Sequence, residues 1–293
     1  MTDPLRAEPL RAPGPGPGPG QPVSTPGGLP ILMYHSISPA AAPGFERFAM
    51  HPTDFASHMA FLAGAGYQTL TVTEAMTAQD RHQPLPERSV VLTFDDGFAD
   101  FHTTALPILR EHRLRATLYV ITGYVGGTGR WLADCDEQGR QMIGWSQLRE
   151  AAAEGVEIGA HSHTHPQLDR LDTTRLAAEI RRPKVLLEDQ LGLAVNSFAY
   201  PFGYWDKATR RAVAAAGYDN ACGVDDLPAH RGENRHALPR LTVNAGTSVE
   251  QLRQLLHLRP SRGAVAAVPL KRGLWRAARR VGRVHPQWRD LTV

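Results

Sequence analysis

The side chains best suited to chemistry lie in two short runs of this 293-residue sequence, at Asp95 with Asp96 and at His161 with His165. The two aspartates are adjacent, precede a glycine and end the β-branched and apolar run 89–94. Two carboxylates this close repel each other, so the pair needs a cation or a shared proton. Asp-Asp-Gly is also ordinary turn chemistry, and taken alone this run favours a functional site and a simple turn about equally.

The second run places three histidines within five residues, directly after the apolar segment 156–160. Imidazole nitrogens bind Zn²⁺ and similar ions, and two histidines spaced by four on a turn can converge on one ion, with a carboxylate as third ligand. Three core imidazoles would each need a separate hydrogen-bond partner. A solvated loop or a metal-binding tract of low specificity is the alternative. Because the run follows a predicted strand, we favour a metal site.

A third candidate is Ser-Phe-Ala-Tyr-Pro-Phe-Gly at 197–203, a predicted strand that breaks at Pro201. Such a turn could present backbone N–H groups to a developing oxyanion and aromatic faces to a sugar ring. Pro-x-Gly is also common in loops that follow strands, so this run alone is weak evidence for a functional site. Trp131 and Trp145 are further candidates for stacking on sugar, with core packing an equal alternative.

Short apolar runs that alternate with segments of helical period must position these side chains. This pattern predicts an α/β fold of β/α units around a parallel sheet, and seven or eight repeats fit a closed or nearly closed barrel better than an open sheet. We expect strands at Ile31–His35, Tyr67–Thr71, Ser89–Phe94, Ala116–Ile121, Val156–Ala160, Ser197–Tyr200, Tyr218–Cys222 and Leu238–Val243, and helices at about 53–65, 101–112, 145–154, 173–191, 205–216 and 248–257. Catalytic residues of such barrels gather at the carboxyl ends of the strands, where all three runs lie.

Length and composition predict one barrel-sized domain with two tails. Residues 1–29 are dominated by Pro and Gly and predict a disordered leader, so the catalytic domain is expected over 30–258. The tail 259–293 holds nine Arg or Lys and one Asp, a net charge of +8, which leaves about −5 for the rest. It is expected to be a solvated or partly disordered end, or a basic amphipathic helix that contacts a membrane surface. No fold motif supports nucleic-acid binding.

The sequence shows no signal-peptide core and no run near the ~18 apolar residues of a membrane span. We therefore expect the protein in the cytoplasm or peripherally at a membrane, with the cell envelope left open. Cys135 and Cys222 lie far apart and form no Cys-x-x-Cys pair, which predicts buried or idle thiols.

Taken together and in this order, Thr-Phe-Asp-Asp-Gly at 93–97, His-Ser-His-Thr-His at 161–165 and Tyr-Pro-Phe-Gly at 200–203 closely resemble the polysaccharide deacetylase family. This family, carbohydrate esterase family four, includes chitin-oligosaccharide and peptidoglycan deacetylases. The resemblance covers about 30–258 and implies an irregular (β/α) barrel of about seven strands. It implies a metal-dependent hydrolase that removes N-acetyl groups from an N-acetylglucosamine-type polysaccharide or oligosaccharide and releases acetate.

The resemblance also assigns roles to individual residues. Asp95 would be the general base, and Asp96, His161 and His165 would bind a divalent metal, with zinc expected and cobalt or nickel as alternatives. His163 falls at a variable position of its motif and is expected outside the ligand set. Substrate contacts are expected from Tyr200, Pro201, Phe202 and Gly203.

The sequence departs from the commonest family pattern at the third motif. Ala199 and Tyr200 stand where an arginine is usual before Pro201, so another cation must orient Asp95. Arg240, in the late predicted strand, is our candidate for this catalytic role, and an exposed surface arginine is the alternative.

The usual late Leu-x-His motif for a general acid is also missing in a convincing form. His257 has the right neighbours but lies in a predicted helix. Ile-Leu-Met-Tyr-His at 31–35 instead resembles the first strand of the branch that deacetylates poly-β-1,6-N-acetylglucosamine, where a rearranged barrel brings the acid histidine from the start of the chain. His35, protonated near neutral pH, is therefore our candidate acid.

Two other functions remain open. One is deacetylation of a small N-acetylated glycoside or biosynthetic intermediate inside the cell, and the other is a carbohydrate-binding relative without catalysis. A binding module would have no need for a base beside a metal site, which disfavours the second. The expected partner is an N-acetylated carbohydrate, and no protein partner is predicted.

Overall fold

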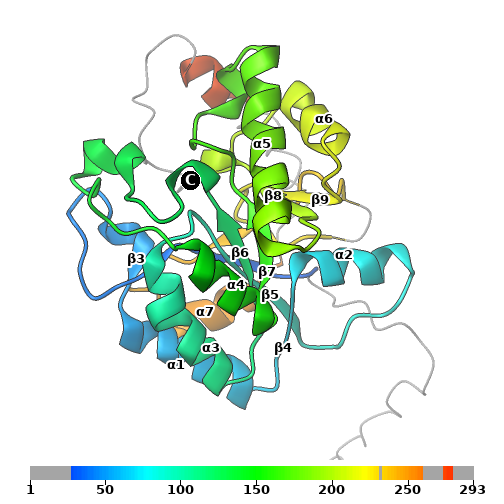
Figure 1. Ribbon diagram of the computed structural model, residues 1–293. Helices are drawn as coiled ribbons and strands as arrows, with labels where there is room; N and C mark the ends of the chain where they lie inside the picture. Colours follow the sequence, from blue (N-terminus) through cyan, green and yellow to red (C-terminus); the bar gives the residue numbers. More distant parts are fainter. Residues whose placement is uncertain (1–27, 231–232, 260–272, 280–293) are drawn as a thin grey trace, which may run out of the picture.

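The computed structural model describes residues 28–230, 233–259 and 273–279. Its centre is a curled parallel sheet of eight strands in the order β10-β1-β5-β6-β7-β8-β9, in which β4 also pairs with β5 (Figure 1). The strands are β1 (Ile31–Tyr34), β4 (Gln68–Leu70), β5 (Ser89–Phe94), β6 (Thr117–Val120), β7 (Glu157–Ala160), β8 (Ser197–Ala199), β9 (Asn220–Cys222) and β10 (Leu241–Thr242). A separate parallel pair joins β2 (Ser36–Ile37) to β3 (Ala49–Met50).

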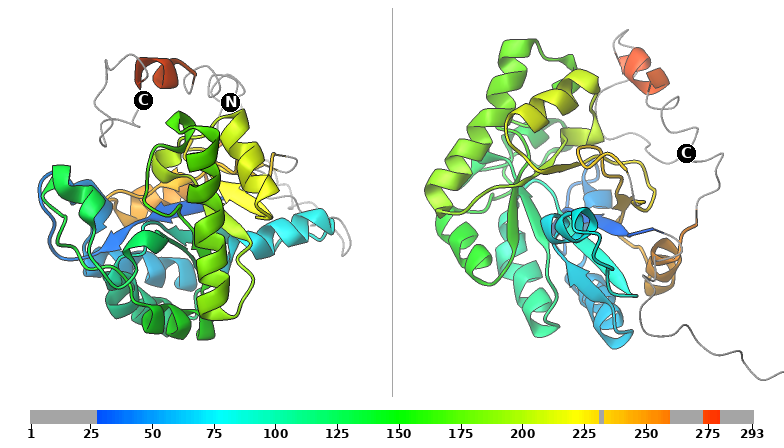
Figure 2. Two further views of the ribbon diagram at one scale, coloured as in Figure 1. Left: turned by 45° about the horizontal axis from the view of Figure 1, so that its top comes forward. Right: turned by 90° about the vertical axis from the view of Figure 1, so that its right-hand side faces the viewer.

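Helices lie along the outer side of the sheet, as Figure 2 shows. They are α1 (Pro52–Gly64), α2 (Val72–Asp80), α3 (Leu106–Glu111), α4 (Trp145–Ala153), α5 (Thr173–Leu191), α6 (Lys207–Ala215) and α7 (Val249–Leu256). Several begin at side-chain caps, since Asp172 accepts a hydrogen bond from the Arg175 N–H and Asp206 accepts one from the Thr209 N–H. None of the described helices is long and apolar enough to cross a membrane.

The segment between β9 and β10 joins the two edges of the sheet. Leu238 forms a parallel bridge with Cys222 in β9, and Leu241 pairs with Leu32 in β1. The chain therefore passes from one edge strand to the other within five residues. Arg240 lies in this seam and its side chain is completely buried, which rules out the exposed surface arginine as an alternative.

The structure confirms the predicted α/β barrel and the alternation of its elements. Strand β5 matches the expected bounds, and all six of its residues are buried because strands in the middle of a covered parallel sheet contact neighbours on both faces. The predicted helix 101–112 is instead a π-helical turn followed by α3. Pro107 has no N–H to continue the regular ladder, which explains the irregular turn before it.

Among the strands and α-helices of the described residues, three were not predicted, namely β2, β3 and α2. Helix α2 has a complete capping box, in which Thr71 accepts from the Glu74 N–H and the Glu74 carboxylate accepts from the Thr71 N–H. That signal was available in the sequence. Leu29 is buried and bridges Ala229, so the fold begins slightly before the predicted start. Residues 1–27 of the predicted leader and most of the tail 259–293 lie outside the described residues.

Candidate active site

Strand β5 delivers two adjacent carboxylates to the carboxyl end of the sheet. The Asp95 N–H still donates to the Tyr34 carbonyl of β1, at 3.0 Å, and the chain turns immediately afterwards. Asp96 and Gly97 have φ angles of 73° and 76°, a conformation that is uncommon for any residue but glycine. Backbone strain of this kind clusters at functional sites. Both aspartate side chains are buried.

Asp95 is paired with Arg240 through both of its oxygens. Arg240 Nη1 donates to Asp95 Oδ1 at 2.6 Å, and Nη2 donates to Oδ2 at 2.7 Å. The guanidinium also donates from Nε to the Gly223 carbonyl at 3.0 Å and from Nη1 to the Thr93 hydroxyl at 3.1 Å. Burial alone raises the pKa of Asp95, but the charges of Arg240 and His161 and the hydrogen bonds from Arg240 together outweigh burial and hold this pKa well below its usual range. Asp95 is therefore ionised across the ordinary pH range.

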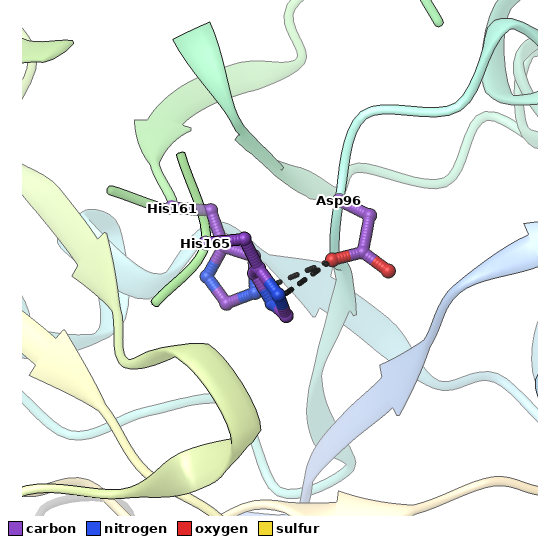
Figure 3. Close-up of side chains that lie close together, drawn as sticks. All are labelled: Asp96, His161 and His165. Atoms are coloured by element: carbon purple, nitrogen blue, oxygen red, sulfur yellow. Dashed lines mark ion pairs between the residues drawn. The ribbon is translucent and has the colours of Figure 1, made fainter. Parts of the chain in front are cut away.

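Asp96 has a different environment, because it faces two imidazoles. Asp96 Oδ1 lies 3.5 Å from His161 Nε2 and 3.4 Å from His165 Nε2 (Figure 3). His161 Nδ1 donates to the Ala199 carbonyl at 2.8 Å, which fixes the tautomer and leaves the Nε2 lone pair facing the carboxylate. Neither Asp96 oxygen receives a hydrogen bond within the described part of the chain.

This donor set fits a divalent cation. The three ligand atoms lie within 4.8 Å of one another and belong to buried residues. Burial and the neighbouring Asp95 raise the pKa of Asp96 well above its usual value, and burial lowers the pKa of His161 and of His165. A cation between the three groups would offset the cost of burying the ionised carboxylate, and it would bind both imidazoles in their neutral form.

Asp95, His161 and His165 line a pocket that is open to solvent. The cavity is lined by Met33, His35, Arg47, Phe48, Asp95, His161, His165, Phe202, Gly203, Tyr204, Val224 and Thr242. His35 packs on the Phe48 ring at 4.8 Å between centroids. Burial lowers the pKa of His35 to about 4, although the charge of Asp95 opposes this shift. The structure therefore does not support a His35 that is already protonated near neutral pH.

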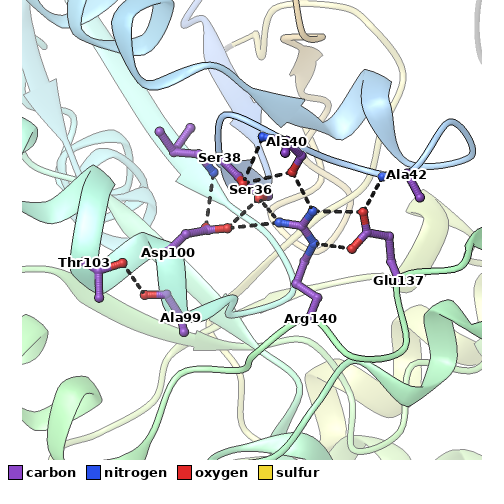
Figure 4. Close-up of polar contacts among 10 residues, drawn as sticks. Ser36, Ser38, Ala40, Ala42, Ala99, Asp100, Thr103, Glu137 and Arg140 are labelled. Carbon is purple, nitrogen blue, oxygen red and sulfur yellow. Dashed lines mark hydrogen bonds and ion pairs between the residues drawn. The ribbon is translucent and has the colours of Figure 1, made fainter.

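A polar cluster around Arg140 anchors the loop that follows His35 (Figure 4). Arg140 donates to the Ser36 hydroxyl at 2.8 Å and to the Ala40 carbonyl at 3.1 Å, and it pairs with Glu137 at 3.1 Å. Asp100 accepts from the Ser36 hydroxyl at 2.5 Å. This cluster ties the loop that carries the cavity residues 47 and 48 to the turn after β5.

Only part of the predicted substrate loop, residues 200–203, lies at the cavity. Phe202 and Gly203 line the cavity, whereas Tyr200 and Pro201 do not. The Tyr200 ring is fully buried and its hydroxyl donates to the His236 carbonyl at 2.8 Å, so its position corrects the prediction that it contacts substrate. The Gly203 N–H donates to the Tyr200 carbonyl at 2.8 Å and is thus not directed at an oxyanion.

Gly203 is required at its position for steric reasons. It has a φ of 69°, and a Cβ atom there would lie 2.8 Å from Val224 Cβ. The adjacent Phe202 has a φ of 59°, and its ring lies 4.5 Å from the His165 ring. The turn therefore presses an aromatic side chain against one of the candidate metal ligands.

The other sequence candidates lie outside the ligand set. His163 Nδ1 and the Thr122 hydroxyl are 2.9 Å apart, and this hydrogen bond holds the ring away from Asp96. Trp131 stacks on Tyr124 at 4.9 Å, and Trp145 packs against the core. Both cysteines are buried and free, as predicted. Sequence reasoning did not identify six of the residues that line the cavity, namely Met33, Arg47, Phe48, Tyr204, Val224 and Thr242.

Comparison with known proteins agrees with this geometry. Residues 82–221 match the family model described as polysaccharide deacetylase. YxkH of Bacillus subtilis, whose name refers to the same family, is 29% identical over 223 residues, which are 76% of this chain and 74% of that protein. The poly-beta-1,6-N-acetyl-D-glucosamine N-deacetylase of Staphylococcus aureus (strain MRSA252) is 24% identical over 208 residues, 68% of this chain and 69% of that protein.

Two solved structures share the fold over most of both chains. The deacetylase PplD of Streptococcus pyogenes, in complex with acetate, has a TM-score of 0.66 and 26% identity and covers 78% of this chain and 97% of its own. IcaB from Ammonifex degensii has a TM-score of 0.66 and 25% identity, with 79% and 98% covered.

Proposed function

We propose that this chain, whose residues 82–221 match the polysaccharide deacetylase family model, hydrolyses the N-acetyl group of an N-acetylglucosamine-type polysaccharide or oligosaccharide. The products would be acetate and a free amino sugar. The observation that carries the proposal is the contrast between two adjacent carboxylates, of which Asp95 is neutralised by an arginine and Asp96 faces two imidazole nitrogens. The name of the staphylococcal relative and the acetate bound to PplD support this substrate class.

Asp96, His161 and His165 would hold the divalent ion, with zinc expected and cobalt or nickel as alternatives. When bound, such an ion would polarise the acetamide carbonyl and lower the pKa of a bound water toward ~7. The hydrogen bond from His161 Nδ1 to the Ala199 carbonyl orients that ring for its ligand role.

Asp95 is the proposed general base that takes a proton from the attacking water. Its pairing with Arg240 keeps the carboxylate ionised and fixes both of its oxygens. Each oxygen accepts one hydrogen bond from the guanidinium and retains a second lone pair for the water. Arg240 is thus proposed to position and ionise the base.

His35 is the proposed acid that delivers a proton to the departing amine. Because burial lowers its pKa to about 4, the ring is neutral in the free protein and must gain its proton during turnover. Asp95 is the proposed source of this proton, because Asp95 takes a proton from the water and because the charge of Asp95 raises the pKa of His35. The proton would then pass from water to Asp95, to His35 and to the amine nitrogen as the carbon–nitrogen bond breaks.

Acetate release tests this function directly. The substrates are poly-β-1,6-N-acetylglucosamine, chitin oligomers and a monomeric N-acetyl glycoside, each with Zn²⁺ or Co²⁺ and with chelator. We expect chelator-sensitive release from the polymeric or oligomeric substrates, abolished in Asp96→Ala and retained in the exposed control Asp189→Asn. Release from the monomeric glycoside alone would favour the small-glycoside alternative, and no release at one ion per chain would contradict deacetylation of these substrates.

A further inference from the structure

Residues 273–279 of the basic C-terminal tail form a short helix (red in Figure 1) that packs beside the cavity. Its contacts are to the loops that follow β7 and β8, at the carboxyl end of the sheet. Trp275 Nε1 donates to the Tyr204 hydroxyl at 2.8 Å, and Arg279 Nη1 donates to Gln167 Oε1 at 2.8 Å. Tyr204 itself lines the cavity.

Two arginines of this helix are neutralised by aspartates of the barrel. Arg279 pairs with both oxygens of Asp169, at 3.2 and 2.7 Å, and both side chains are buried. Arg276 Nη2 lies 2.6 Å from Asp206 Oδ2. Two of the tail's cations therefore form ion pairs within the chain, and fewer remain to bind the anionic membrane surface considered above.

A continuous row of side chains in ring contact runs from this helix to a candidate metal ligand. The Arg279 guanidinium lies 3.6 Å from the centre of the Tyr204 ring. Tyr204 stacks on Phe202, with centroids 5.7 Å apart and planes at 24°. Phe202 in turn lies 4.5 Å from the His165 ring. The C-terminal helix thus fixes one wall of the cavity through Tyr204, on both the ring face and the hydroxyl.

We infer that residues 273–279 are a positioning element of the active site, which holds Tyr204 in place as part of the surface that binds the sugar chain. This inference rests on the proposed function for the identity of the ligand. Arg279 and Trp275 touch neither the cavity nor the candidate ligands, so they act through Tyr204. A pre-positioned aromatic wall lowers the ordering cost of binding, and its loss should weaken substrate affinity more than the chemical step.

The test compares Arg279→Ala, Arg279→Lys and the exposed control Arg175→Ala in the full chain, with an N-acetylglucosamine oligomer as substrate. We expect Arg279→Ala to raise KM about tenfold while kcat stays within about twofold, and Arg279→Lys to lie between it and the unaltered protein because lysine cannot bind both Asp169 oxygens. Zn²⁺ affinity, measured alone, should be unchanged in all three variants.

Hydrogen exchange of residues 200–206 provides a readout that does not depend on catalysis. Arg279→Ala should speed exchange in this segment and leave β5 and β6 unchanged, whereas Arg175→Ala should change neither. Unchanged exchange, or a fall in kcat with constant KM, would overturn the inference. Faster exchange in a protein that deacetylates nothing would instead contradict the proposed function and leave the docking of the helix intact.

Discussion

The described residues contain two buried arginine–aspartate ion pairs with different roles. One lies inside the barrel and the other lies at its rim. Arg240 and Asp95 pair at 2.6 and 2.7 Å in the seam that joins β9 to β1, and Arg279 and Asp169 pair at 3.2 and 2.7 Å between the tail and the loop after β7. The inner aspartate lines the cavity, whereas the outer one does not. The inner pair therefore sets the charge of the proposed base, and the outer pair joins a distant segment to the cavity wall.

The partners of the two guanidinium groups extend this contrast. Arg240 also donates to the Gly223 carbonyl and to Thr93, so the ends of β5 and β9 hold it and its geometry is fixed by the barrel. Arg279 instead stacks on Tyr204, whose position it determines. In this account the barrel positions the proposed base, while the tail positions part of the proposed substrate surface.

The largest expected effect comes from removing the charge at the inner aspartate. Asp95→Asn should lower kcat by about 10²–10⁴, because the amide cannot accept the water's proton. Asp169→Asn, the same change at the outer pair, should leave kcat within about twofold. Steady-state kinetics of both variants measure this, and equal losses of kcat would remove the distinction between the pairs.

Breaking the inner pair from the arginine side should cost stability as well as activity. Arg240→Ala leaves a buried carboxylate without its partner, and we expect unfolding free energy to fall by about 3–5 kcal/mol. Denaturant unfolding with unchanged slope checks this value. Arg253→Ala, at an exposed ion pair with Glu250, is the control and should lose no more than about 1 kcal/mol. A similarly small loss for Arg240→Ala would show that Asp95 finds another donor.

Metal removal should destabilise the inner site selectively. A free ion concentration about 100 times the dissociation constant stabilises a folded protein by about 2.7 kcal/mol, and chelator removes this contribution. Asp96→Ala should abolish the response to chelator, whereas Asp169→Asn should retain it. Thermal unfolding with and without chelator measures the difference. An undiminished response in Asp96→Ala would mean that the ion binds elsewhere.

The smallest expected effect is the pH dependence contributed by His35. Burial lowers the pKa of His35 to about 4, so between that value and its ordinary one the unfolded chain binds a proton that the folded chain does not. Stability is then full above the ordinary pKa and falls as the pH drops toward the folded one. From about pH 7 to about pH 5 the metal-free protein should lose about 2 kcal/mol more than His35→Gln does. Equal losses would place His35 in solvent.

The sequence predicted what depends on local patterns. The ends of β5 and β7 are recognisable because apolar runs stop at clusters of carboxylates and imidazoles, and the structure brings Asp96, His161 and His165 together. The pairing of Arg240 with Asp95 was predicted from the family resemblance, because the arginine that is usual before Pro201 is replaced in this sequence, and the structure shows the pair. No local sequence pattern distinguished Tyr200 from Phe202. The Tyr200 hydroxyl is hydrogen-bonded to the backbone, whereas Phe202 lines the cavity.

The features that escaped prediction all depend on tertiary contacts. The left-handed backbone of Asp96, His165 and Phe202 is not a property of those residue types. The low pKa of His35 follows from burial, which the sequence does not display. The docking of residues 273–279 requires Asp169 and Asp206, which are more than sixty positions away in the chain.

Asp95 is proposed as the base and Asp96 as a metal ligand, and paired metal and acetate measurements test this difference most directly. Bound Zn²⁺ per chain and acetate released from poly-β-1,6-N-acetylglucosamine would be measured for the unaltered protein, Asp95→Asn and Asp96→Ala. We expect one ion per chain in the first two, acetate release from the first alone, and neither in Asp96→Ala. Loss of the ion in Asp95→Asn, or acetate release from that variant at the unaltered rate, would contradict this account.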